Sequence, residues 1–160
     1  MTNHLRDIEQ DFFDAYFSNL SDDDKEGITT ISASSPGNDA TSSELLALYL
    51  CGKKTAGSGL VADYINTGDP LPKPGHLWIV LDKDKKPKCI LKTVAVEVHK
   101  FKDVPERIAK AEGEGDLSLD YWRRAHQEFF KPHLKRLKIE NLDEAEVVTE
   151  FFERVHKAED

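Results

Sequence analysis

The chain has 160 residues, 39% of them hydrophobic and 32% charged, which excludes a disordered chain and is typical of one globular domain. No run reaches the roughly 18 apolar residues of a membrane span. The N-terminus carries charged residues where a secretory signal has its apolar core, so we expect a cytoplasmic protein that binds no membrane. The net charge of −8 argues against a protein that coats nucleic acid nonspecifically.

The charge is unevenly distributed along the chain. Residues 51–138 hold 18 Lys and Arg against 12 Asp and Glu, whereas both ends are acidic. This distribution fits a local site for an anion, although an ordinary solvated surface also produces it. Cys51 and Cys89 form no CxxC pair and have no histidine cluster nearby, so we expect two reduced thiols and no zinc site.

The N-terminal quarter is predicted to be helical and then irregular. Apolar residues recur at helical spacing over residues 4–20, which predicts an amphipathic helix with an aromatic stripe in the core. The acidic run over residues 21–24 is expected to end this helix in a solvated turn. Residues 27–40 are rich in Gly, Ser, Thr, Asn and Pro, so we expect a loop, with a short strand over residues 28–32.

A second helix and a connector follow. Ser42 or Ser43 is expected to cap a helix that runs to Leu50. The segment Gly57-Ser58-Gly59 is then predicted to cap a short helical turn. The segment GDPLPKPG has three prolines in eight residues and predicts a rigid connector.

The second half of the chain carries most of the predicted strands. Strands are expected over residues 77–81 and 88–100, joined by the turn DKDKKP, because valines alternate in the second. A short helix is expected over residues 103–111, a longer one capped by Ser118, and a last strand over EVVTEFFERV. Helices and strands interleave without regular βαβ units, which favours an α+β fold, a mixed β-barrel with helices packed around it.

The segment GKKTAGSG, residues 52–59, is the first candidate for chemistry. It places two lysines, two hydroxyls and three glycines within eight residues. Glycines let a ligand approach the backbone, and a helix N-terminus offers free N–H groups to an anion. The spacing is not that of a Walker A loop, and a solvated turn has a similar composition.

The second candidate is the segment EGEGD, residues 112–116, in which glycines separate three carboxylates. Such a loop can bind a hard cation such as Mg²⁺ or supply a general base, and it can equally be a solvated loop before a helix. The lysines of the turn at residues 83–88 are more typical of solubility and edge protection than of phosphate binding. His126, on the aromatic face of its predicted helix, is more typical of a half-buried core histidine than of a ligand.

Five stretches in this order resemble the ASCH domain family: SELLALYLCGKKTAGSGL, GDPLPKPGHLWIVLD, KCILKTVAVEVHKFKDV, AEGEGDLSLDYWRRAHQEFF and EVVTEFFERV. The resemblance runs from about Ser43 to Val155, and the fourth stretch is its most specific part. It implies a PUA-like mixed β-barrel, a fold shared by RNA-binding modules. We therefore expect a single domain over residues 1–160, in which residues 1–40 form an N-terminal extension of helix and loop.

The resemblance also implies a site. Some bacterial members of the family remove acetate from N4-acetylcytidine with a lysine, a threonine and a glutamate. By resemblance the lysine falls on Lys54 and the glutamate on Glu112, which are expected to meet across a groove wide enough for a nucleobase. Gly57 stands where family members often carry the threonine, and Thr55 and Ser58 are the nearest substitutes.

The candidate catalytic residues are therefore Lys54, Thr55 and Glu112. We expect the ligand itself to contact further side chains around the same cleft: Lys53, Ser58, Tyr64, Glu114, Trp122 and Arg123. Trp122 or Tyr64 would stack on the base, although Trp122 on its helix face is also typical of core packing.

Three functions fit these residues. The favoured one is a binding module for RNA or a modified nucleoside, which needs no cofactor and no metal. The alternatives are an amidohydrolase that deacetylates N4-acetylcytidine and a ribonuclease that uses the EGEGD carboxylates with Mg²⁺. Gly57 speaks against the amidohydrolase, and the net charge of −8 favours a short or single-nucleotide ligand over long RNA. The oligomeric state is not indicated.

Overall fold

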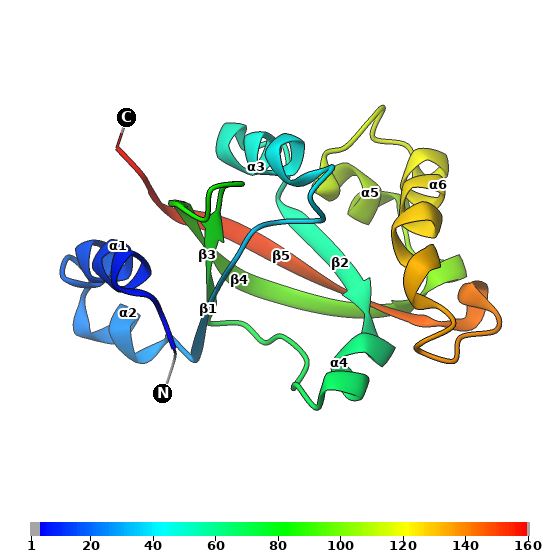
Figure 1. Cartoon of the computed structure of the whole chain (residues 1–160), viewed down its shortest axis with the longest axis horizontal. Coiled ribbons are helices and arrows are strands. Elements are labelled where there is room, and N and C mark those ends of the chain that lie inside the picture. Colours follow the sequence, from blue (N-terminus) through cyan, green and yellow to red (C-terminus); the bar gives the residue numbers. More distant parts are fainter. Residues whose placement is uncertain (1–3, 160) are drawn as a thin grey trace. The chain divides into compact units, whose positions relative to one another are not determined.

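The computed structural model describes residues 4–159, and within this range helices and strands alternate irregularly, as the α+β prediction requires. Figure 1 shows the arrangement. The α-helices are α1 (Asp7–Phe17), α2 (Asp22–Glu26), α3 (Ser42–Cys51), α4 (Val61–Thr67), α5 (Glu106–Glu112) and α6 (Leu119–Phe130). The strands are β1 (Thr30–Ser34), β2 (Ala56–Leu60), β3 (His76–Leu81), β4 (Pro87–Lys100) and β5 (Glu146–Lys157).

The five strands form one sheet in the order β1-β3-β4-β5-β2. β1 pairs parallel with β3, whereas β3 pairs antiparallel with β4, and β2 pairs antiparallel with β5. In this order β1 and β2 are the two edge strands, so the sheet is not closed. The expectation of a β-barrel was wrong in this respect, because closure depends on pairing between distant strands and leaves no local mark on the sequence.

The chain divides into two compact units. The first comprises the described residues of 4–52, 73–95 and 152–159, and the second comprises residues 53–72 and 96–151. β4 begins in the first unit and ends in the second, whereas β5 begins in the second unit and ends in the first.

The first unit is built on β3, which is buried on both faces. On one face Leu77 and Ile79 pack with Phe13 of α1. On the other face Val80 packs with Tyr49 of α3. A strand covered on both sides reads as a continuous apolar run, and this explains the sequence HLWIVL.

Two elements of the first unit differ from the prediction. The acidic run begins a helix, α2, and does not only end the helix before it. The Ser21 hydroxyl accepts from the Asp24 N–H, and three aspartates occupy the first turn, where the helix dipole is positive. The strand β1 lies two residues later than predicted, where it pairs with β3 in parallel. The predicted helix over residues 4–20 is present as α1, which is shorter at both ends.

In the second unit, the segment Ala56–Leu60 forms the strand β2. We expected its glycines to cap a helical turn. The strand forms because the segment pairs with Val147–Phe151 of β5, a partner about 90 residues away that no local pattern reveals. The helical turn follows at α4, directly after Leu60.

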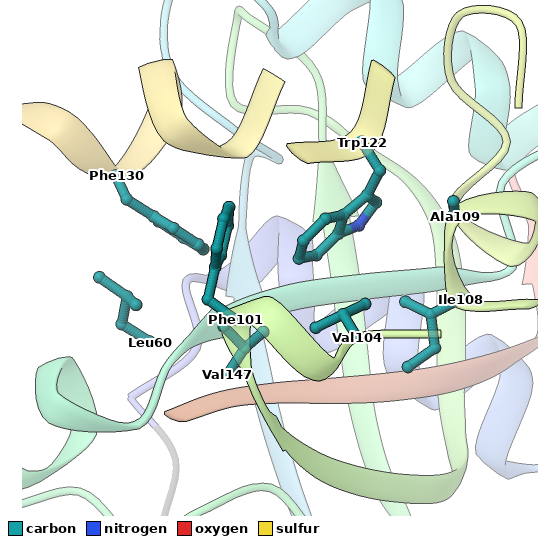
Figure 2. Close-up of a cluster of buried hydrophobic side chains, with 8 residues drawn as sticks. All are labelled: Leu60, Phe101, Val104, Ile108, Ala109, Trp122, Phe130 and Val147. Carbon is teal, nitrogen blue, oxygen red and sulfur yellow. The ribbon is translucent and has the colours of Figure 1, made fainter. Parts of the chain in front are cut away.

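The apolar core of the second unit lies between β2, β5, α5 and α6. Figure 2 shows its members, which come from these four elements and the segment before α5: Leu60, Phe101, Val104, Ile108, Ala109, Trp122, Phe130 and Val147. The Ser118 hydroxyl accepts from the Tyr121 N–H, so the predicted cap of α6 is confirmed. This core fixes the C-terminal end of α5 and the first turns of α6, from which the polar side chains described next extend.

Candidate functional site

The GKKT and EGEGD segments meet where α5 ends. The Thr55 backbone N–H donates to the Ala111 carbonyl at 2.7 Å, which ties the chain entering β2 to the last turn of α5. Gly113 then turns the chain with a φ of 70°, and a Cβ atom at this position would lie 2.1 Å from the Lys53 carbonyl oxygen. Only glycine permits this approach, so the first glycine of EGEGD is required by the contact with GKKT.

Lys54 is held by two carboxylates. Its Nζ lies 3.1 Å from Oε1 of Glu112 and 2.9 Å from Oε2 of Glu114. The side chains of Lys54 and Glu112 are 4% and 2% exposed, whereas that of Glu114 is 24% exposed. The expected contact between Lys54 and Glu112 is therefore present, with Glu114 at the edge that reaches solvent.

The carboxylate of Glu112 accepts three hydrogen bonds from side chains. Its Oε2 accepts from the Ser58 hydroxyl at 2.7 Å and from the Trp122 indole N–H at 2.5 Å, while its Oε1 accepts from Lys54. Burial would raise the pKa of Glu112, but its interactions with His126 and Lys54 outweigh burial and hold it below its usual range. Glu112 is therefore an ionised carboxylate and a weak base.

Thr149 belongs to the site although the sequence did not point to it. Its hydroxyl lies 2.7 Å from that of Ser58, and its side chain is fully buried. The two residues are partners in the β2–β5 register. Only this strand pairing reveals Thr149, because it stands 91 positions from Ser58 in the chain.

His126 also faces the site. Its ring stacks on Trp122 with centroids 4.1 Å apart, and its Nε2 lies 3.4 Å from Oε1 of Glu112. The sequence predicted a half-buried core histidine, whereas His126 is buried, 7% exposed, and lies beside Glu112. The available signal was its spacing of four residues from Trp122, which places both side chains on one face of α6.

Trp122 is a core residue, 3% exposed, whose indole packs on Phe101 with centroids 5.4 Å apart (Figure 2). Its ring contacts both Phe101 and His126. Arg123 donates to the carbonyl oxygens of Phe101 and Lys102, so its guanidinium holds the chain before α5.

The remaining predicted residues lie at different distances from Glu112. The Thr55 hydroxyl donates to the Ala111 carbonyl at 3.1 Å, and Lys53 is exposed beside it. Tyr64 of α4 packs near Gly59, and burial, with help from Glu150, raises its pKa to about 12. Ser58, and not Thr55, is thus the hydroxyl that the structure places on Glu112.

The space beside Glu112 is small. A cavity of about 10 Å³, room for about one water molecule, is lined by residues of α5, α6 and the loop between them: Ala109, Glu112, Glu114, Tyr121, Trp122, Ala125 and His126. Lys54 and Glu112 touch directly and do not face each other across an open groove. The expectation of a nucleobase-sized groove between these two side chains was therefore wrong, because their attraction closes the gap.

The EGEGD carboxylates do not fit a metal site. Among residues 4–159 no group of three or more His, Cys, Asp or Glu side chains is arranged to hold an ion. Glu112 and Glu114 both point at Lys54, and Asp116 accepts from the Ser118 N–H at the start of α6.

Within residues 4–159, no helix has the length and apolar character needed to cross a membrane.

Comparisons with known proteins identify the family. The ASCH domain model matches residues 32–156. The ASCH domain of Lactobacillus crispatus JV V101 superposes with a TM-score of 0.88 at 32% identity, over 96% of this chain and 98% of that one. Protein EF3133 of Enterococcus faecalis V583 superposes with a TM-score of 0.74 at 28% identity, over 94% and 86% of the two chains. No curated protein matches the sequence. The chain therefore belongs to the ASCH domain family.

Proposed function

We propose that this chain binds RNA or a modified nucleoside at the solvent edge of the Lys54 cluster, which we define as Lys54, Ser58, Glu112, Glu114 and His126. The observation that carries the proposal is the pair of buried charges, Lys54 and Glu112, with a third charged group, Glu114, at the solvent edge. Membership of a PUA-like family often linked to RNA binding supports the same reading.

The buried pair is costly for a purely structural element. Removing a carboxylate and an ammonium from water costs several kcal/mol per ion, and well-packed apolar residues in their place are often as stable or more so. Buried charges with strongly shifted pKa values are concentrated at functional sites. The Lys54 cluster lies beside an intact apolar core, so the unit does not depend on it for hydrophobic burial.

The chemistry of the cluster suits a nucleobase edge. A glutamate carboxylate accepts from an exocyclic amino group such as N4 of cytosine, and a lysine ammonium donates to a carbonyl oxygen. Glu114 offers such an acceptor at the solvent edge, where its side chain is 24% exposed while it accepts from the buried Lys54 at 2.9 Å. Lys53, the neighbour of Lys54 in the chain, is exposed, and its ammonium suits contact with a phosphate.

A second candidate is the amide hydrolysis of N4-acetylcytidine, and one contact favours it. The Ser58 hydroxyl, 2.7 Å from Glu112, stands in for the threonine that Gly57 replaces. In this reaction the Ser58 oxygen attacks the acetyl carbonyl and its proton passes through Glu112 to the departing cytosine amine, while Lys54 stabilises the oxyanion. Water then releases acetate from the serine ester. The low pKa of Glu112 makes it a poor proton acceptor, so binding remains the first candidate.

The proposal is tested by titrating the protein with cytidine, N4-acetylcytidine and a short single-stranded RNA in a calorimeter, with chromatography of the same samples to detect released cytidine. We expect at least one of the three ligands to bind. Its affinity should fall about tenfold or more in Glu114→Ala, since a hydrogen bond to a charged group is worth about 1.5–3 kcal/mol.

Glu128→Ala is the matched control, because Glu128 is an exposed glutamate of α6. Equal affinity in Glu114→Ala and the unaltered protein, or no binding of any of the three ligands, would overturn the proposal. Cytidine release that is lost in Ser58→Ala would replace binding by hydrolysis.

A further inference from the structure

The hydrogen bonds of His126 restrict its protonation. Its Nδ1 lies 2.8 Å from the carbonyl oxygen of Trp122, one turn earlier in α6. A carbonyl oxygen can only accept, so Nδ1 carries a proton and donates it. If the ring were neutral, Nε2 would then be an unprotonated nitrogen with its lone pair pointing outward.

That second nitrogen points toward negative charge. Nε2 lies 3.4 Å from Oε1 of Glu112, and both atoms belong to residues that line the cavity of about 10 Å³. A lone pair that faces a carboxylate oxygen at this distance is repelled, whereas an N–H at Nε2 is attracted. The imidazole is 9% exposed, so water screens the interaction little.

The charge balance of the cluster points the same way. The charged groups around His126 are Glu112 from α5, Glu114 from the loop before α6, and Lys54 from the segment before β2. Tyr121 and Trp122 of its own helix contribute an uncharged lining. One ammonium against two carboxylates leaves one negative charge unbalanced, and an imidazolium cancels it. Buried charges persist when they are paired in this way.

We propose that His126 is an imidazolium in the folded protein and acts as the positioning residue of the Lys54 cluster. With Lys54 on one side and His126 on the other, Oε1 of Glu112 is held between two cations. Glu112 then stays ionised and fixed, and Glu114 is the carboxylate of the cluster left to bind a ligand at the solvent edge. This role for His126 rests on the proposed function, but its protonation state does not.

The protonation state is tested without any ligand, by ¹⁵N NMR of the intact protein labelled at histidine. We expect both ring nitrogens of His126, assigned by comparison with His126→Gln, to show the shifts of a protonated imidazolium at pH 7. His99 is the internal comparison for a histidine that faces a carboxylate nearer to solvent. Its Nε2 lies 2.9 Å from Glu97, and its side chain is 27% exposed. A neutral ring protonated only at Nδ1, with a water molecule in the cavity, would overturn the inference.

The positioning role is tested by the affinity of the ligand identified in the calorimeter as a function of pH. His126→Gln keeps a donor for Glu112 and removes the charge, so we expect affinity about tenfold weaker, the worth of a charge-assisted hydrogen bond, and little dependence on pH. His133→Gln, a half-buried histidine beside Arg136, should leave both unchanged.

Unaltered affinity and pH dependence in His126→Gln would reject the positioning role. An imidazolium signal in a protein that binds none of the three ligands would reject the proposed function and keep the assignment of the proton.

Discussion

Two glutamates of the second unit have nearly the same partners and different surroundings. Glu112 faces His126 and Lys54, and Glu97 faces His99 and Arg107. The side chain of Glu112 is 2% exposed, whereas that of Glu97 is 30% exposed and that of Arg107 is 58% exposed.

Both carboxyl groups have a lowered pKa, but the causes are ranked differently. Hydrogen bonds from Arg107 and then His99 bring the pKa of Glu97 to about 2, with little opposition from burial. At Glu112 burial is the largest influence and raises the pKa, so the partners must overcome it. The comparison teaches that an exposed carboxylate can stay ionised without its charged partners, because water replaces them. A buried carboxylate cannot, because it has no water to replace them.

The largest expected effect is the loss of Lys54. Lys54→Met leaves Glu112 buried without its ammonium, and we expect the free energy of unfolding to fall by about 3–5 kcal/mol in urea titrations. Arg107→Met, the equivalent change at Glu97, should fall within the error of the same measurement because water solvates the exposed carboxylate. Similar losses in the two variants would show that burial does not separate the two glutamates.

Acid should separate them next. The pKa of Glu112 is lower in the folded than in the unfolded protein, so the stability that it contributes is complete above about pH 4.5 and is lost as the pH falls toward the folded value. We expect Glu112→Gln to be less stable at pH 7 and to lose less of its remaining stability between pH 5 and pH 2. Glu97→Gln should change the acid dependence in the same direction but by less, because water screens the exposed pair. The measurement is urea unfolding by circular dichroism across that range.

A smaller effect is expected when one donor to Glu112 is removed and the charges are kept. Trp122→Phe retains most of the ring that packs on Phe101 but removes the indole N–H, which should cost about 1–3 kcal/mol. Phe130→Leu offers a control in the same core that removes no hydrogen bond to Glu112. If the stability of Trp122→Phe is unchanged, the hydrogen bond to Glu112 carries no stability.

The smallest effect is the dependence on salt. In 1 M NaCl the screening length is about 3 Å, so any destabilisation in Arg107→Gln at low salt should disappear. The loss in Lys54→Met should persist, because the ion pair is shielded from solvent. Parallel melting curves at low and high salt test this. If the loss of stability in Lys54→Met depends on salt, the Lys54–Glu112 pair of the unaltered protein is in contact with bulk water.

Local patterns predicted much of the secondary structure. The apolar spacing of α1, the alternating valines of β4 and the Ser118 cap of α6 were recognised because each depends on residues within one or two turns. The same reasoning misread β2 and the start of α2. For β2 the deciding interaction is its pairing with β5, which lies far away in the chain.

The site was predictable in part. Resemblance to the family placed Lys54 and Glu112 together, and their ion pair is present. Thr149 and His126 were not recognised, because their relation to Glu112 depends on the β2–β5 register and on the direction of one face of α6. Nor did the sequence indicate that Ser58 reaches Glu112 while Thr55 bonds to α5.

The sequence by itself determined most of the helices and strands, which faces are apolar, and which two segments carry the charged side chains. Only the tertiary structure decided that the sheet stays open and that Lys54 and Glu112 touch with no groove between them. The physical reason is range. Periodicity and capping act over a few residues, whereas strand order and the desolvation of a charge are set by chain segments that meet only after folding.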